Sequence, residues 1–429
     1  MSQQNFVTID IRQAKVGLFV TLDLSWLEHP FLTNSFKIKN EQQLDLLKRL
    51  GLTMLRYNPE RSDGQALEAA ATDQPSESHA PQISADEMAI IAAKQARIER
   101  LKKHRDSVTH CEKQLLEAAS TLKSINRDLF SRPQETLRAA VDLVKQMADA
   151  MLVNRDIALH ALNDKVAGEE VYFHSLNVSV LAMMLAKELK LSHELINLLG
   201  LGALFHDIGK LDVPDKILRK TAPLTPPERG FLNQHTRYGV DIAAKLAMPK
   251  AVVDIILHHH ECMDGSGYPD KLRGDEIQKL TRIVAVVNAF DIFCNPVNPD
   301  RALTPYEAIS TMFAKQRQKF DPVLLTSFIK LMGVYPPGTI VLLNNELWGI
   351  VVSVNTARPT LPQVLVYDPE VPKNEAIILH LEDDPDLVIS KTYRPNQIPS
   401  DVFDYLSPRR RVTYFYDEAK SGKKGAKPA

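Results

Sequence analysis

The sequence predicts a mainly α-helical protein, in which a central all-helical domain lies between a small α+β module and a small β-rich module. Two patterns indicate this fold class. Apolar residues recur at helical spacing from Pro133 to Cys294, interrupted by Pro and Gly and without a convincing strand. Short runs rich in β-branched residues occur instead before residue 60 and after residue 336. With 429 residues and 44% hydrophobic side chains, the chain has enough apolar material for two or three domains.

The first 60 residues form the predicted α+β module. The β-branched runs FVTIDI and GLFVTLDL are followed by the helical pattern QLDLLKRLGL. Residues 61–84 are rich in Gly, Ser, Pro and Ala and poor in large apolar groups, which is typical of a linker. Ser84 and Glu87 have the spacing of a capping box, so a long helix and connector is predicted over residues 85–139. A solvated helix packed along the core is favoured here over a coiled coil or a signal-transmitting helix.

The helical domain is predicted over residues 140–335 and the β-rich module over residues 336–400. The pattern changes after YPPG at residues 335–338, where GTIVLLNNELWGIVVSV contains two alternating runs around an Asn-Asn turn at residues 344–345. The segments QVLVYDP and LVIS are expected to add strands. Residues 401–429 are assigned to a tail, and its end, KSGKKGAKPA, is expected to be disordered.

The composition excludes several classes of partner. The 52 basic and 53 acidic side chains nearly cancel, so no global field favours DNA, RNA or an anionic membrane. The run Arg409–Arg411 and the Lys-rich end are interpreted as solubilising charges. The three cysteines are widely spaced, which favours reduced thiols. The first residues contain no apolar signal-peptide segment and no stretch of about 18 apolar residues follows, so a cytoplasmic protein without a membrane span is expected.

Histidines are concentrated in the predicted helical domain. Of the 13 histidines, eight lie between residues 160 and 260. Glu170 and His174 are four residues apart, so they share one helix face. His206 and Asp207 end the strongly apolar segment LLGLGALF, and Gly209 is expected to stop that helix.

Two further helices contribute histidines. His235 lies on a helix whose start is marked by TPPE at residues 225–228. The run His258-His259-His260 ends the apolar segment AVVDIIL. Consecutive helix residues point about 100° apart, so only two adjacent histidines of this run can face one site. Any single histidine is most simply a core or surface residue, but the whole set indicates a shared site.

The chemistry of this set favours a divalent metal cluster. Imidazoles and carboxylates without cysteine suit iron, manganese or another borderline ion better than a structural zinc. Cys262 is interpreted as a small buried filler and not as a ligand. An aspartate beside a ligating histidine can bridge two ions, and two ions about 3.5 to 4 Å apart support in-line displacement at phosphorus. The sequence therefore predicts hydrolysis of a phosphodiester.

The order of these motifs resembles a known family. His206-Asp207-Ile208-Gly209-Lys210, then His235, then HHECMDGSGYP at residues 259–269 is similar to the HD-GYP family of cyclic di-GMP phosphodiesterases, a branch of the HD metal-dependent phosphohydrolases. The resemblance covers about residues 140–335 and implies an all-helical HD-type domain. A small N-terminal domain of undefined role and a β-rich C-terminal extension often accompany such domains, and the flanking modules show a weaker likeness to these.

The resemblance implies roles for individual residues. Asp207 is implied as the bridging ligand and as a catalytic residue together with Lys210, which would meet the substrate phosphate. A cluster of two or three ions, most simply iron or manganese, is implied to be held by Glu170, His174, His206, Asp207, His235, His259, His260 and Asn288. Glu170 matches the extra acidic ligand that allows a third ion. Contact with the substrate is implied for Lys210, Gly267, Tyr268, Pro269, Asp291 and Arg301, and the glycines around Tyr268 are expected to bring that loop close to the cluster.

One position departs from the family pattern. Asn288 stands where the family usually has an aspartate ligand. An amide oxygen can coordinate a metal but brings no charge, and loss of even an indirect partner of a ligand costs about 10- to 100-fold in affinity or activity. Asp291, on the same helix face, could compensate in part. A tolerated variant in a working enzyme is favoured.

The function implied by the resemblance is hydrolysis of cyclic di-GMP to pGpG and, if the linear dinucleotide is accepted, to GMP. The implied partners are cyclic di-GMP as substrate and a signalling protein, for example a diguanylate cyclase. The alternative is a catalytically weak module that binds cyclic di-GMP and relays it. A third reading keeps the chemistry but changes the substrate to another cyclic dinucleotide or a nucleotide monophosphate, which the Gly-Tyr-Pro loop argues against.

Overall fold

The computed structural model divides the chain into two compact units, residues 1–104 with 367–378 and residues 105–366 with 379–429. It confirms the predicted mainly α-helical class with small sheets in the N-terminal and C-terminal regions. None of the helices in the part of the chain that it describes has both the length and the apolar character needed to cross a membrane. The residues that it describes are 6–24, 29, 31, 35–64, 85–153, 159–162, 170–355, 357–369, 371, 373, 376–383, 386–408 and 413–416.

The first unit contains a four-stranded antiparallel sheet in the order β1-β4-β2-β3. Its elements are β1 (Val7–Asp10), β2 (Phe19–Thr21), β3 (Ser35–Lys37), α1 (Glu41–Arg49) and β4 (Met54–Asn58). Helix α1 begins where the Asn40 side chain accepts a hydrogen bond from the backbone N–H of Gln43. Its apolar face, with Leu44 and Leu47, joins a core that also contains Leu18 and Leu55. Most of the predicted linker, residues 65–84, lies outside the described residues.

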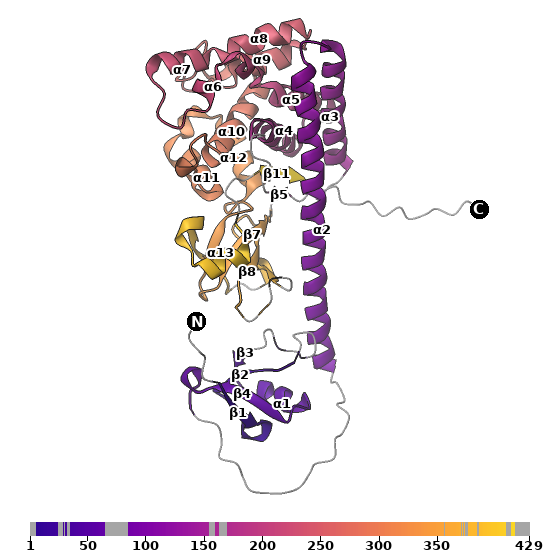
Figure 1. Ribbon diagram of the computed structural model, residues 1–429, viewed down its shortest axis with the longest axis vertical. Coiled ribbons are helices and arrows are strands. Elements are labelled where there is room, and N and C mark those ends of the chain that lie inside the picture. Colours follow the sequence, from indigo (N-terminus) through magenta and orange to yellow (C-terminus); the bar gives the residue numbers. More distant parts are fainter. Residues whose placement is uncertain are drawn as a thin grey trace, which may run out of the picture. The chain divides into compact units, whose positions relative to one another are not determined.

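The second unit is predominantly helical, and Figure 1 labels its helices. The helix α2 is continuous across the division between the two units. The helices are α2 (Ala85–Asp128), α3 (Pro133–Val153), α4 (Glu170–Glu188), α5 (His193–Phe205), α6 (Asp215–Leu218), α7 (Pro226–Asn233), α8 (His235–Lys245), α9 (Lys250–His258), α10 (Lys279–Cys294), α11 (Pro305–Lys315) and α12 (Pro322–Met332).

Sequence signals account for several helix boundaries. At the predicted helix start, the Thr225 side chain accepts from the backbone N–H of Glu228, and the Glu228 carboxylate accepts from the backbone N–H of Thr225, which confirms the capping box. The prediction that His235 lies on this helix is wrong, because α7 ends at Asn233 and His235 begins the separate helix α8. The same arrangement begins α11 at Thr304 and Glu307. Each satisfies backbone donors that a helix start would otherwise leave without partners.

One core holds the helices together around the histidine-bearing segments. Apolar residues from α2 (from Cys111 onward), α3, α4, α5, α9, α10 and α12 belong to a single buried cluster. Its largest fully buried side chains include Phe173, Phe205, Phe290 and Phe328. Because α4, α5 and α10 are apolar on most of their surface, much of each helix lies in the interior of the unit, and some of their polar side chains, such as Asn177, Asn288 and Asp291, are buried with them.

The C-terminal β-module follows α12. Its five-stranded sheet has the order β10-β6-β7-β8-β9, with antiparallel pairing for β10-β6, β6-β7 and β7-β8. The strands are β6 (Ile340–Leu343), β7 (Trp348–Ser353), β8 (Gln363–Val366), β9 (Ile377–His380) and β10 (Ile389–Tyr393). The predicted hairpin around residues 344–345 is therefore present as β6 and β7.

The structure differs from the prediction of a tail from residue 401 onward. Residues Ser400–Leu406 form α13 and Thr413–Tyr416 form strand β11, whereas 409–412 and 417–429 lie outside the described residues. Strand β11 pairs antiparallel with β5 (Leu159–Leu162), a strand that the helical pattern of the central domain did not indicate. Each strand is only four residues long and its partner is far away in the sequence, so neither leaves a local pattern. The other domain boundaries stay predictions.

Candidate metal centre

The predicted histidines converge from four segments of the second unit. His174 projects from α4, His206 and Asp207 follow the end of α5, His235 begins α8, and His259 with His260 follows the end of α9. We expected Gly209 to end α5, but α5 ends at Phe205 with His206 as its C-cap. Gly209 lies in the 3-10 helix η4 (Ile208–Asp212), whose start places Asp207 among the histidines.

The carboxylate of Asp207 lies at the centre of the cluster. Its Oδ2 is 3.3 Å from Nε2 of both His174 and His206. Its Oδ1 is 3.3 Å from Nε2 of His235 and 3.7 Å from Nε2 of His259. The potential ligand atoms form two groups, and the atoms of each group lie within 4.8 Å of one another. One group is His174, His206 and Asp207, and the other is Asp207, His235, His259 and His260. Asp207 belongs to both. This geometry suits a carboxylate that bridges two ions.

Backbone carbonyls orient three of the histidine rings. Nδ1–H donates to the carbonyl three residues earlier in each case, at 2.7 Å for His206, 2.7 Å for His235 and 2.9 Å for His259. A carbonyl can only accept, so the proton is on Nδ1 and the lone pair of Nε2 faces Asp207. Histidines that bind metals are commonly oriented by a hydrogen bond on the other ring nitrogen.

Burial keeps most of these imidazoles neutral. It lowers the pKa of His259 to about 3 and lowers the pKa of His206 and of His260 as well. Burial by itself would raise the pKa of Asp207, but Lys210 and His206 lower it well below its usual range. Neutral imidazoles around an ionised carboxylate are the forms that bind a cation.

His174 differs electrostatically from the other histidines. Burial by itself would lower its pKa, but Asp291 and Asp207, one at each side of the ring, raise it to about 9. The Nδ1 atom is 2.5 Å from Oδ2 of Asp291. The metal-free ring is therefore held as a cation between two carboxylates, and Nε2 must lose its proton when it binds a metal.

Two buried oxygen atoms of the predicted ligand set have no hydrogen-bond partner among the described residues. They are Oδ1 of Asp207 and Oδ1 of Asn288, on side chains that are 6% and 2% exposed. A buried acceptor without a donor is costly, and a bound cation can satisfy such an oxygen in place of a hydrogen bond. Together with the neutral imidazoles, the Asp207 oxygen makes the donor set fit a divalent metal, and the unpartnered amide oxygen of Asn288 is compatible with a ligand role.

The loop that carries Tyr268 is held against the cluster. Gly265 has φ +77°, in the region that favours glycine. A Cβ at Gly267 would lie 2.5 Å from the backbone N of Cys262, so only glycine allows this approach. The ring of Tyr268 stacks on that of His260, with 4.6 Å between centroids and 23° between planes. The Tyr268 ring thus covers one side of a potential ligand, and Pro269 follows it in the same loop.

Lys210 contacts the cluster and is partly exposed to solvent. Its Nζ donates to Oδ2 of Asp207 at 2.5 Å, and its side chain is 31% exposed. The ammonium group is therefore beside the Asp207 carboxylate and still partly open to solvent.

Several predicted residues lie elsewhere. Glu170 begins α4, but its side chain lies outside the described part of the structure. Arg301 is exposed at the end of the 3-10 helix η6 (Pro299–Arg301). His258 is not part of either ligand group and instead pairs with Asp270 at 3.0 Å. Asp291, expected to contact the substrate, is 1% exposed and lies behind His174, because α10 carries it into the core.

Two residues that the sequence analysis did not single out support the site. Glu261 is 2% exposed and accepts from the backbone N–H groups of Asp270 at 2.7 Å and Leu272 at 3.1 Å, which holds the loop after Pro269. Asn177 donates to Asp291. Asn177 lies three residues after His174 on one helix, and this spacing could have indicated that the two share a face. The contacts of Glu261 could not have been predicted in this way, because they depend on how the loop turns back.

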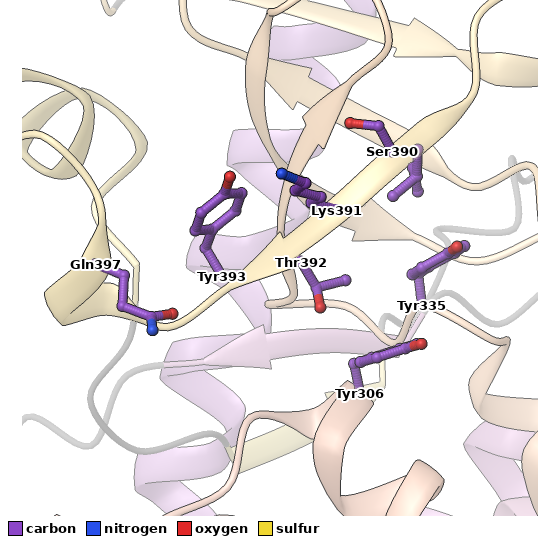
Figure 2. Close-up of a pocket in the computed structure, with 8 residues that line it drawn as sticks. Tyr306, Tyr335, Ser390, Lys391, Thr392, Tyr393 and Gln397 are labelled. Atoms are coloured by element: carbon purple, nitrogen blue, oxygen red, sulfur yellow. The ribbon is translucent and has the colours of Figure 1, made fainter.

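A cavity of about 380 Å³ also occurs in the second unit, between α11 and β10 (Figure 2). The rings of Tyr306 and Tyr335 stack at its edge, 5.5 Å apart with 11° between their planes. The residues that line it include no histidine, aspartate or glutamate, so it is not part of the metal centre: Tyr306, Tyr335, Ile389, Ser390, Lys391, Thr392, Tyr393 and Gln397.

Family comparisons agree with this geometry. Residues 150–324 match the family model described as HD domain. Residues 6–140 match a domain of unknown function (DUF3391), which covers the N-terminal module, the linker and the long helix together. The helical fold and the clustered histidines and aspartate define a metal-dependent phosphohydrolase of the HD class.

Similarity to curated proteins extends over most of the chain. The cyclic di-GMP phosphodiesterase PA4108 of Pseudomonas aeruginosa is 30% identical over 363 residues, which is 84% of each chain. The cyclic di-GMP phosphodiesterase response regulator RpfG of Xanthomonas campestris is 33% identical over 155 residues, 36% of this chain and 41% of the relative. A cyclic di-GMP phosphodiesterase of Thermotoga maritima is 34% identical over 170 residues, 38% of this chain and 45% of the relative. The chain belongs to the HD-GYP family of phosphodiesterases.

Proposed function

We propose that this protein hydrolyses cyclic di-GMP to pGpG at the cluster around Asp207, with GMP as a further product if the linear dinucleotide is bound again. The observation that carries the proposal is the pair of ligand groups that share the buried Asp207 carboxylate. A cyclic dinucleotide as substrate is supported by the three relatives described above, each of which is named as a cyclic di-GMP phosphodiesterase.

The proposed ligands are His174, His206, Asp207, His235, His259, His260, Asn288 and, for a third ion, Glu170. When bound, the ions, most simply iron or manganese, polarise the phosphoryl group and lower the pKa of a water molecule for attack. The neutral Nε2 atoms and the ionised Asp207 hold the positive charge in a buried site, where electrostatic interactions are stronger than in water. Metal analysis of anaerobically purified protein, together with turnover, would identify the ions.

The remaining residues bind and orient the substrate. Lys210 reaches past Asp207 toward solvent, so its ammonium group can pair with the phosphate and stabilise the charge that develops on it. In the loop of Gly267, Tyr268 and Pro269, the Tyr268 ring stacks on His260 and so covers one side of that proposed ligand. Arg301 stays a predicted substrate contact. For Asp291 the contacts with His174 favour a role behind the ligand and not at the substrate.

The double variant His206→Ala, Asp207→Ala tests the proposal, because it removes ligands from both groups. Metal-loaded parent protein should convert cyclic di-GMP to pGpG, and the variant should lose both metal and turnover. A parent that leaves cyclic di-GMP intact and behaves like the variant would reject it. Other cyclic dinucleotides in the same assay define the substrate range.

A catalytically weak sensor that binds cyclic di-GMP and relays it to a partner is the second candidate, favoured only by the amide at Asn288. Asn288→Asp restores the expected carboxylate at a buried position, so it separates the two functions. A working enzyme should change its turnover by less than about 10-fold. A large gain in metal content and turnover would instead support the sensor. A protein partner such as a diguanylate cyclase stays a prediction.

A further inference from the structure

A chain of hydrogen bonds connects strand β11 to the candidate ligand His174. The backbone N–H of Tyr414 donates to Oδ1 of Asn177 at 2.7 Å. Nδ2 of Asn177 in turn donates to Oδ1 of Asp291. Oδ2 of Asp291 accepts from Nδ1 of His174 at 2.5 Å, and Nε2 on the other side of that ring faces Asp207 at 3.3 Å.

Every intermediate group in this chain is buried. Asn177 and Asp291 are each 1% exposed, and Tyr414 is fully buried. Water therefore cannot replace a missing partner, and each unmet donor or acceptor carries its full desolvation cost. Asn295 donates a second hydrogen bond to Oδ1 of Asp291 at 2.8 Å, while Oδ2 is taken by His174, so the carboxylate cannot turn freely.

The backbone of β11 determines which way the Asn177 amide points. A backbone N–H can only donate, so Oδ1 must face Tyr414 and Nδ2 must face Asp291. A flipped amide would set its NH2 group against the N–H of Tyr414 and its oxygen against the carboxylate. Strand β11 thereby makes Asn177 a donor toward Asp291, and Asp291 keeps the proton of His174 on Nδ1.

The strand is anchored independently of the metal centre. It pairs with β5, with Tyr414 opposite Ala161. The hydroxyl of Tyr414 donates to the carbonyl of Pro337 at 3.0 Å, and its ring lies 6.0 Å from that of Phe290 in the core. The N–H that meets Asn177 is therefore held by contacts in which no proposed ligand takes part.

We propose that Asn177 is a positioning residue of the metal centre, and that strand β11 completes that centre from a point 237 residues further along the chain. Asn177 acts through Asp291 to fix the orientation and tautomer of His174, which leaves Nε2 for the metal. The proposal rests on the proposed function only in that His174 is a metal ligand.

The test measures Mn²⁺ binding by the full-length protein, using competition with a chelator of known affinity. Asn177→Leu keeps the branching of the side chain and removes both hydrogen bonds, so Mn²⁺ affinity should fall by about 10- to 100-fold. Ser179→Ala is the matched control, because Ser179 is buried on the same helix but donates to the Gly200 carbonyl, at 3.0 Å, and not toward Asp291. Parental Mn²⁺ affinity in folded Asn177→Leu would overturn the proposal.

Two variants examine the contribution of β11. Tyr414→Phe loses the hydroxyl bond to Pro337 but keeps the N–H, so Mn²⁺ affinity should match the parent. Deletion of residues 413–416 should lower Mn²⁺ affinity as much as Asn177→Leu does, and combining the two should add little, since both break one chain of interactions. Fully additive losses would show that β11 acts by another route. If the deletion prevents folding, Asn177→Leu against Ser179→Ala still decides the role of Asn177.

A further variant distinguishes a failure of this proposal from a failure of the proposed function. His174→Ala should weaken Mn²⁺ binding whatever Asn177 does. If His174→Ala binds Mn²⁺ like the parent, the metal centre itself is wrongly assigned. If His174→Ala is impaired and Asn177→Leu is not, only the positioning role is rejected.

Discussion

Among single residues, Lys210 is the group whose position most directly suggests a role in turnover. Its ammonium group contacts Asp207 yet remains partly exposed, so it can pair with a phosphate without being needed to hold a metal. We predict that Lys210→Met lowers kcat by about 100- to 1,000-fold, as expected for loss of one group that stabilises charge in the transition state. Metal content should stay unchanged, and exposed Lys245→Met on α8 should retain full activity. Loss of metal from Lys210→Met would contradict this assignment.

Glu261 illustrates a residue that acts on the site through the backbone. Its buried carboxylate accepts from the N–H groups of Asp270 and Leu272. In Glu261→Gln an NH2 group must replace one acceptor, so the free energy of unfolding should fall by about 1–3 kcal/mol, measured by urea denaturation. Glu276 accepts a comparable bond from the N–H of Arg273, but at an exposed position and with one oxygen, which Gln retains. Glu276→Gln should therefore change the free energy of unfolding by less than about 0.5 kcal/mol. Equal effects would mean that burial of Glu261 is not what matters.

At the scale of elements, the contact between η4 and α8 depends on the missing side chain of Gly209. A Cβ there would lie 1.9 Å from the carbonyl oxygen of His235 and 2.4 Å from the N of Gly239, both backbone atoms. We predict that Gly209→Ala destabilises the protein by at least about 1–3 kcal/mol, because η4 and α8 must separate. That separation also moves His235 away from Asp207, so metal content should fall.

The control for this substitution lies on the neighbouring helix α7. A Cβ at Gly230 meets nothing within 4 Å, so Gly230→Ala should stabilise the protein by about 0.5–1 kcal/mol through helix propensity alone. Thermal unfolding and metal analysis of both variants check the pair. A Gly209→Ala protein that keeps its stability and metal would show that the two elements adjust without cost.

The start of α7 carries a pH-dependent contribution to stability. Hydrogen bonds from Lys220 and Thr225 lower the pKa of Glu228 from 4.5 to about 2. A carboxyl group with a lowered pKa stabilises the folded state above its unfolded pKa, and this stabilisation is lost as the pH falls through the folded value. The parent should therefore be more stable than Glu228→Gln at neutral pH, and the difference should shrink as the pH falls from about 4.5 toward 2. Urea denaturation at several pH values measures it, and a difference independent of pH would refute it.

For the whole molecule, metal binding should couple to folding. The cluster draws on α4, α5, η4, α8 and α9, so an ion bound there links most of the helical core. With free metal at 100 times its dissociation constant, stability should increase by about 2.7 kcal/mol, and a chelator should remove this increment. Thermal unfolding with and without Mn²⁺ tests it. The His206→Ala, Asp207→Ala variant should show no such shift.

The sequence allowed prediction of those features that depend on short-range patterns. The helical class, the start of α7 at Thr225 and the hairpin of β6 and β7 follow from spacing that a few residues display locally. The choice of His259 and His260 over His258 followed from the family resemblance, through their spacing to Gly-Tyr-Pro, and the structure gathers these two around Asp207 while His258 pairs with Asp270. The roles of these residues as ligands stay proposals until metal is measured.

Other features required the three-dimensional arrangement because their partners are distant in sequence. Asp291 was expected at the substrate, yet helix α10 buries it behind His174, and no spacing rule on α10 alone reveals which neighbour it meets. Strand β11 follows a polar stretch that suggests a tail, but Tyr414 gains a buried place and a hydrogen-bonded partner only when α4 and α10 are already packed. Local patterns decided which side chains could bind a metal, since residue type and helical spacing are written in the chain. Tertiary packing decided which of them meet and which groups hold them, since that depends on contacts made across hundreds of residues.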